Sequence, residues 1–193
     1  MELILASQSP RRRQLLTQLG LHFTVQPAQA DETFPPELSP EEAVALISAR
    51  KAAAAVLSAP ADAVVLAADT IVVVEDRVLG KPRSEEEARE MLRQLSGRSH
   101  RVMTGVTLRQ GSRAESFTEI TELEFRPLSE GEIRAYVATG DSMDKAGAYG
   151  VQGLAAAFVR RLRGDYFNVM GLPLCALCEP LRRFGIAVLG EKG

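Results

Sequence analysis

Hydroxyl and basic side chains gather directly after the first apolar run of the chain. Residues 2–6 suit a buried strand, and the next segment reads Ser7-Gln8-Ser9-Pro10-Arg11-Arg12-Arg13. A serine followed by proline predicts the start of a helix, where free backbone N–H groups and the helix dipole favour an anion. Arginine suits phosphate because its planar guanidinium bonds two oxygens at once. The segment therefore indicates a phosphate site, or alternatively a capped helix with solvated basic residues.

A carboxylate stands beside the most apolar strand pattern. Asp69 and Thr70 follow the run 63–68 and precede the run 71–74. We therefore expect Asp69 at the carboxyl end of a strand, the edge at which open α/β sheets bind ligands. A carboxylate there can hold a divalent cation or accept a proton from water. The plainer alternative is an aspartate that makes local turn hydrogen bonds.

Other charged residues lie where they suit either binding or an ordinary surface. Lys81 is flanked by Gly80 and Pro82, which predicts a stiff loop that presents the ammonium group. This segment lacks the spacing of a Walker A phosphate loop. Lys51 lies in an alanine-rich helical pattern and Glu32 in a proline-containing loop. Taken alone, each of these residues also fits a solvated surface position.

A glycine-rich segment carries one polar side chain suited to a base. Residues 144–153 read Asp-Lys-Ala-Gly-Ala-Tyr-Gly-Val-Gln-Gly, and we expect the glycines to let backbone approach a ligand closely. Gln152 offers one donor group and one acceptor, which complement the carbonyls and N–H of a uracil or thymine ring. The alternative is a glycine-rich turn with an exposed glutamine.

Apolar periodicity and capping residues outline the elements that must position these side chains. Strand patterns occupy residues 2–6, 22–26, 63–68, 71–74 and a hairpin formed by 101–110 and 115–125. Helical patterns occupy residues 11–19, 40–58, 84–96, 129–139 and 173–184, and capping boxes open three of them at Ser39, Ser84 and Ser129. Strands that alternate with helices, plus one long hairpin, predict an α/β protein with a mixed sheet.

Composition excludes several classes of protein. The 193 residues are 46% hydrophobic and 25% charged, which is typical of a soluble globular protein and not of a disordered chain or a coiled coil. The net charge of −2 argues against a nucleic-acid binder. No apolar stretch is long enough for a membrane helix, and residues 1–6 do not form a signal peptide. We expect one cytoplasmic domain over residues 1–193 with no membrane partner.

The cysteines and histidines do not predict a metal site. Cys175 and Cys178 form a C-x-x-C, which is compatible with redox chemistry or half a zinc site. A zinc site needs four ligands, and only His22 and His100 remain, each isolated in the sequence. We therefore expect two small apolar side chains on one face of a helix.

Together these segments resemble the Maf family of nucleotide pyrophosphatases over nearly the whole chain. The motifs are Leu5-Ala6-Ser7-x-Ser9-Pro10-Arg11-Arg12, Ala68-Asp69-Thr70, Gly80-Lys81-Pro82, Leu95-Ser96-Gly97-x-x-His100-x-Val102-x-Thr104-Gly105, residues 144–153 and Gly171-Leu172-Pro173-Leu174. The resemblance implies a mixed twisted sheet flanked by helices, similar to inosine triphosphatases, with two lobes around a central cleft. It also implies a homodimer.

The resemblance implies hydrolysis of a nucleoside triphosphate to the monophosphate and pyrophosphate, with Mg²⁺ or Mn²⁺ as the divalent cation. Asp69 matches the family's proton acceptor, and we expect Asp69 and Glu32 to hold the metal ion. The residues that would line the triphosphate and metal site are Ser7, Arg12, Glu32, Lys51, Asp69 and Lys81.

The resemblance also bears on the choice of nucleotide. Arg11, Thr70 and Gln152 match positions of the subgroup that prefers dTTP and UTP, whereas a sister subgroup acts on 7-methyl-GTP. Two departures from the family pattern are Asp141, where a glutamate is usual, and Arg50, which stands directly before Lys51. Two alternatives remain: a pyrophosphatase for 7-methyl-GTP or another modified nucleotide, and a nucleotide-binding regulator of cell division and septum formation with little turnover.

Overall fold

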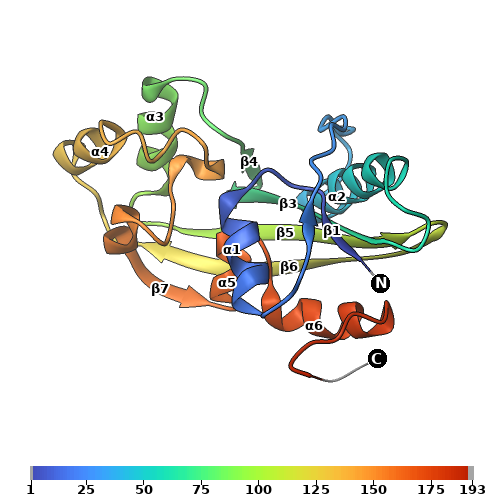
Figure 1. Cartoon of the computed structure of the whole chain (residues 1–193). Helices are drawn as coiled ribbons and strands as arrows, with labels where there is room; N and C mark the ends of the chain where they lie inside the picture. Colours follow the sequence, from blue (N-terminus) through green and yellow to red (C-terminus); the bar gives the residue numbers. More distant parts are fainter. Residues whose placement is uncertain (1, 191–193) are drawn as a thin grey trace. The chain divides into compact units, whose positions relative to one another are not determined.

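A seven-stranded mixed sheet organises the fold (Figure 1). The computed structural model describes residues 2–190. The strands are β1 (Leu3–Leu5), β2 (Thr24–Val25), β3 (Val64–Val74), β4 (Arg77–Leu79), β5 (Ser99–Gln110), β6 (Arg113–Phe125) and β7 (Val159–Arg163). Their order is β2-β1-β3-β5-β6-β7, with β4 paired to β3. β1 pairs in parallel with β2 and β3, whereas β4 and β7 pair antiparallel with β3 and β6, so the predicted mixed sheet is confirmed.

Helices connect these strands, and most begin where the sequence predicts. They are α1 (Pro10–Gln18), α2 (Pro40–Val56), α3 (Glu85–Leu95), α4 (Glu130–Val137), α5 (Tyr166–Met170) and α6 (Leu174–Arg183), with 3₁₀-helices η1 (Ala146–Ala148) and η2 (Leu154–Phe158). Ser39 and Ser129 form the predicted reciprocal capping boxes. At Ser84 the box is incomplete, because the Glu87 carboxylate accepts from the backbone N–H of Arg83 instead. The short helix α5 was not predicted.

β3 corrects the prediction that Asp69 follows a strand. Asp69 and Thr70 lie inside one continuous strand, Val64–Val74, and not between two. β1 pairs with β3 only as far as Leu66, and β4 pairs with it from Val72 onward. The strand continues between these points because β5, which is 12 residues long, flanks β3 on its other side. Asp69 therefore lies beyond the end of β1, although not beyond the end of its own strand.

The described residues group into two compact units, and the boundaries fall within β3, β5 and β6. Unit 1 consists of the described residues of Met1–Asp69, Thr104–Glu119 and Gly171–Gly193. Unit 2 consists of Thr70–Met103 and Ile120–Met170. A single domain with two lobes around a central cleft stays a prediction.

In unit 1, small residues let α2 pack closely on the strands. Ala52 and Ala55 of α2 are buried with Ile4 of β1 and Val65 of β3. A side chain at Gly105 of β5 would place its Cβ 2.4 Å from the carbonyl oxygen of Val44 in α2, so only glycine fits at this position. This close approach fixes the helix that carries Lys51.

In unit 2, a buried aromatic cluster surrounds a histidine. His100 is 2% exposed, and its Nε2 lies 2.7 Å from the Tyr149 hydroxyl. The His100 ring also packs edge-on against Phe125. Helices α3 and α4 pack against one another in the same unit (Figure 1). Burial lowers the pKa of His100 to about 4, so the ring is neutral near pH 7.

The pH dependence of stability tests the buried state of His100. Between pH 6.5 and about 4, the unfolded chain binds a proton at this histidine that the folded chain does not. The neutral ring therefore makes its full contribution to the free energy of unfolding above this range. That free energy decreases as the pH falls, by about 2 kcal/mol between about pH 7 and pH 5. We expect His100→Asn to remove this part of the pH dependence, and replacement of the exposed His22 to retain it. Denaturant unfolding at both pH values measures the difference, and an unchanged slope in His100→Asn would contradict a buried neutral ring.

Candidate functional site

One lysine of unit 1 links two carboxylates from distant parts of the chain. Lys51 Nζ lies 2.7 Å from Glu32 Oε1 and 2.6 Å from Asp69 Oδ1. The lysine comes from α2, the glutamate from the loop before α2, and the aspartate from β3. The Lys51 and Asp69 side chains are 13% and 16% exposed, whereas Glu32 is 66% exposed. The structure thus brings three of the predicted site residues into direct contact.

The connection from β1 to α1 places Arg12 in a fixed position. Ser9 caps α1, and its hydroxyl accepts from the backbone N–H of Arg12. The Arg12 guanidinium donates to the Gly171 carbonyl at 2.8 Å and to the Ser7 hydroxyl at 3.2 Å. Burial lowers the pKa of Arg12 below its usual value, and the charges of Asp69 and Glu32 oppose that shift. Ser7 and Arg12 therefore belong to the same electrostatic environment as the Lys51 cluster.

Arg50 holds the loop that carries Glu32, a role that the sequence did not reveal. Arg50 Nη1 donates to the Thr33 carbonyl at 2.5 Å and to the Asp31 carbonyl at 3.4 Å, and it lies 3.8 Å from the Asp31 carboxylate. The two residues it contacts flank Glu32. Consecutive residues of α2 therefore hold the loop backbone and the Glu32 carboxylate.

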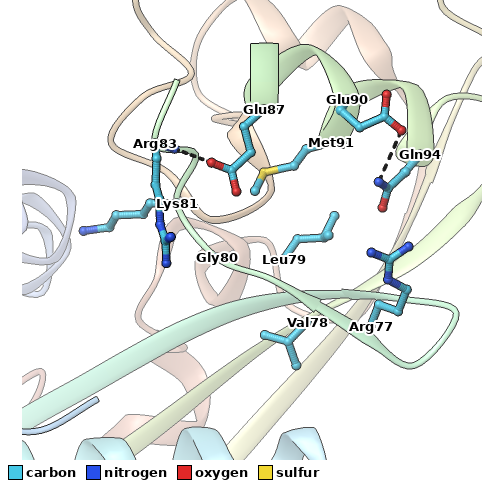
Figure 2. A pocket seen from close by; sticks show the side chains of 10 residues that line it. All are labelled: Arg77, Val78, Leu79, Gly80, Lys81, Arg83, Glu87, Glu90, Met91 and Gln94. Atoms are coloured by element: carbon cyan, nitrogen blue, oxygen red, sulfur yellow. Dashed lines mark hydrogen bonds between the residues drawn. The ribbon is translucent and has the colours of Figure 1, made fainter. Parts of the chain in front are cut away.

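Lys81 lies in unit 2, on the loop that follows β4. Its side chain is exposed and points away from a pocket of about 390 Å³ formed by β4, this loop and α3 (Figure 2). Leu79 and Met91 line the pocket, and the Glu87 carboxylate accepts from the Arg83 backbone N–H at its edge (Figure 2). The pocket therefore does not enclose the Lys81 ammonium group.

The three residues expected to read the base fall in both units. Arg11 is half-buried in α1 of unit 1, and its charge contributes to lowering the pKa of Arg12. Thr70 is half-buried and begins unit 2 directly after Asp69. Gln152 is exposed in unit 2, between η1 and η2. The structure leaves their roles as predictions.

The glycines of residues 147–153 serve internal packing. Gly147 has φ of +68°, and a Cβ there would lie 2.9 Å from the Val72 side chain of β3. A Cβ at Gly150 would lie 2.5 Å from Lys145 Cε. The expectation that these residues are glycine so that backbone can approach a ligand is thus incomplete. At Gly147 the positive φ and the Val72 contact already disfavour a side chain, and at Gly150 a side chain would require Lys145 to move.

The C-x-x-C segment lies on α6, where its two cysteines differ in environment. Cys175 is exposed and Cys178 is half-buried, and both are free thiols. The expected shared apolar face is wrong for Cys175, because the buried stripe of α6 runs through Leu174, Leu177 and Leu181. Within the described part of the chain, no three cysteine, histidine or carboxylate residues gather as they would around a metal ion.

Loss of Arg50 should loosen the Glu32 loop. A hydrogen bond from a charged donor that remains partly exposed contributes about 1 kcal/mol, so we expect Arg50→Ala to raise amide hydrogen exchange around Thr33 about fivefold. The exposed Arg13 offers a matched control, since Arg13→Ala should leave this exchange unchanged. Unchanged exchange in Arg50→Ala would show that the loop is held by other contacts.

The sequence matches the family model described as "Maf-like protein" over residues 2–184. A protein of Pelotomaculum thermopropionicum named "dTTP/UTP pyrophosphatase" is 53% identical over 97% of this chain and 99% of its own length. A protein of Halalkalibacterium halodurans with the same name is 51% identical over 96% of this chain and 97% of its own length.

A solved structure is similar in fold but distant in sequence. The Ham1 protein of Staphylococcus aureus superimposes with a TM-score of 0.51 at 17% identity, over 93% of this chain and 99% of that one. This likeness confirms the expected architecture of a mixed sheet flanked by helices. The family model, the ordered motifs and relatives that are 53% and 51% identical all agree. The chain therefore belongs to the Maf family.

Proposed function

We propose that this protein hydrolyses dTTP and UTP to the nucleoside monophosphate and pyrophosphate. Full-length relatives named for this activity support the reaction and its substrates. The observation within the molecule that carries the proposal is Lys51, held between Glu32 and Asp69 close to the end of β1. Cations and carboxylates that meet in a partly shielded position suit a polyanion accompanied by a metal ion.

The basic residues of this site would bind the triphosphate and stabilise the departing pyrophosphate. Arg12 is fixed by Ser7 and Gly171, so its guanidinium needs little reorganisation to meet a phosphate. Lys51 can pair with a phosphate oxygen in place of one of its carboxylates. Lys81, on the loop after β4, would add a third positive charge. Positive groups that are already in place where charge develops lower the barrier to cleavage of the α–β phosphoanhydride.

Glu32 and Asp69 suit a divalent cation. Mg²⁺ prefers oxygen ligands and is usually held by one or two carboxylates together with substrate phosphates and water, and Mn²⁺ suits the same donors. Residues 2–190 offer two carboxylates at one ammonium but no complete metal site of three or more acidic, histidine or cysteine ligands. These residues therefore fit an ion that arrives with the triphosphate. When bound, such an ion would offset the negative charge of the phosphate oxygens.

Asp69 would accept the proton of the attacking water. Its Oδ1 accepts from Lys51 Nζ at 2.6 Å, which holds the carboxylate in place. The Asp69 side chain is 16% exposed, which limits competing hydration. A carboxylate that a neighbouring ammonium group holds in place suits the role of a positioned base.

Arg11, Thr70 and Gln152 would select the pyrimidine base of the nucleotide. We also propose that the protein forms a homodimer.

The net charge of −2 supports a small-molecule substrate and not a nucleic acid. None of the helices within residues 2–190 combines the length and apolar character of a membrane span.

Product analysis tests the proposed reaction. The protein is incubated with UTP, dTTP, CTP or 7-methyl-GTP and with Mg²⁺ or Mn²⁺, and phosphate is measured with and without added inorganic pyrophosphatase. We expect phosphate from UTP and dTTP only when pyrophosphatase is present. Activity confined to 7-methyl-GTP would contradict the pyrimidine preference, and binding of nucleotide without turnover would favour a regulatory protein.

Asp69→Asn tests the proton acceptor. The amide keeps the shape of the side chain but removes the base, so we expect kcat for UTP to fall by about 10²–10⁴-fold. Asp62→Asn, at an exposed aspartate shortly before β3, is the matched control and should retain wild-type turnover. Near wild-type turnover in Asp69→Asn would exclude this role.

Gln152→Glu tests the reading of the base. The substitution replaces the amide donor with a second acceptor opposite a pyrimidine carbonyl, so we expect kcat/KM for UTP and dTTP to fall about 10- to 100-fold. Activity on CTP should change much less, and Gln14→Glu on the exposed side of α1 should change neither. An equal loss for all nucleotides would contradict a role in base selection.

A further inference from the structure

Two consecutive residues just before Gln152 are held by separate side chains from elsewhere in unit 2. The side chain of Tyr149 contacts His100, and the backbone N–H of Gly150 contacts Tyr136. Both contacts lie within three residues of Gln152. The side chain of Gln152 is exposed and therefore does not anchor the residue by burial. The position of its backbone depends instead on the contacts of Tyr149 and Gly150.

The contact to His100 is a buried hydrogen bond. Tyr149 is 5% exposed and His100 is 2% exposed, and Tyr149 Oη lies 2.7 Å from His100 Nε2. Phe125 packs edge-on against both rings. Because buried polar groups are costly when unpaired, this bond fixes the Tyr149 side chain in one position.

The contact to Tyr136 continues into a charged network. Tyr136 Oη accepts from the Gly150 N–H at 3.2 Å and donates to Asp141 Oδ2 at 2.9 Å. Asp141 Oδ1 in turn accepts from Lys145 Nζ at 2.8 Å. The Lys145 side chain occupies the space that a Cβ at Gly150 would need. Gly150 is therefore held both by its N–H group and by the packing around its Cα.

The chain directly before these contacts adopts a backbone conformation that needs support. Gly147 and Ala148 both have positive φ, 68° and 60°. An alanine in this region is strained, and such a residue persists only where its surroundings hold it. Ala148 is fully buried in the core of unit 2. The surrounding contacts thus hold the backbone conformation of Gly147 and Ala148, which would otherwise relax.

We propose that His100 and Tyr136 are positioning residues for base selection, which they secure by fixing the backbone from Tyr149 to Gln152. This inference rests on the proposed function, in which Gln152 reads the pyrimidine. A glutamine side chain has several rotatable bonds, and displacement of its backbone by about 1 Å is enough to lose a directed hydrogen bond. Neither His100 nor Tyr136 contacts the substrate in this account.

Removal of single hydroxyl groups tests the proposal with little change in shape. Tyr149→Phe breaks the bond to His100, and Tyr136→Phe breaks the bonds to Gly150 and Asp141. We expect each variant to lower the ratio of kcat/KM for UTP to that for CTP about three- to tenfold, through a higher KM for UTP. The kcat for CTP should stay within about twofold of wild type, since the residues that bind phosphate are untouched. Tyr166→Phe, which removes an exposed hydroxyl, is the matched control and should keep the wild-type ratio.

A second measurement separates positioning from loss of folding. Amide exchange at Gly150 should rise in Tyr136→Phe, while exchange in the interior of α2 in unit 1 stays at the wild-type rate. Wild-type selectivity in both variants, or an equal loss for UTP and CTP, would overturn the positioning role while leaving the proposed function intact. Failure of the wild-type protein to hydrolyse UTP would instead overturn the proposed function, and this inference with it.

Discussion

The candidate site depends on one ammonium group that is largely withdrawn from water. Lys51 is 13% exposed, and a charge so placed is costly unless opposite charges meet it. Glu32 and Asp69 meet it from a loop and from a strand, so this balance fixes three segments of unit 1 relative to one another. The close packing of α2, which Gly105 permits, brings the lysine within reach. A bound triphosphate and its cation would replace these ion pairs. The phosphate would then pair with Lys51, and the cation would pair with the carboxylates of Glu32 and Asp69.

Local features of the fold could be predicted because their causes are local. Ser39 and Ser129 begin helices through bonds to residues three positions away, so the sequence alone carries the signal. The continuity of β3 through Asp69 could not be predicted, because it depends on the long neighbour β5. The incomplete box at Ser84 likewise depends on whether Glu87 bonds to residue 83 or 84, which a pattern of residue types does not determine.

The site itself was predicted as a set of residues and not as an arrangement. The resemblance to the family indicated Lys51, but it did not indicate that both of its partners would be carboxylates from the predicted set. The roles of Arg50 and Tyr136 could not be predicted, because each acts through contacts that only the folded chain creates. The glycines near Gln152 were expected to serve a ligand, yet the positive φ of Gly147 and its contact with Val72 already favour glycine there. Residue types thus indicated the chemistry, whereas tertiary contacts determine which side chains hold it in place.

In the proposed function, Glu32 and Asp69 share a metal ion that accompanies the triphosphate. The most direct test is a crystal structure with the non-hydrolysable α,β-imido analogue of UTP and Mn²⁺, in which anomalous scattering locates the ion. We expect the ion within about 2.0–2.5 Å of an oxygen from Glu32 or Asp69 and of a phosphate oxygen, with Lys51 on the triphosphate. An ion bound away from both carboxylates, with Lys51 still held between them, would contradict the account.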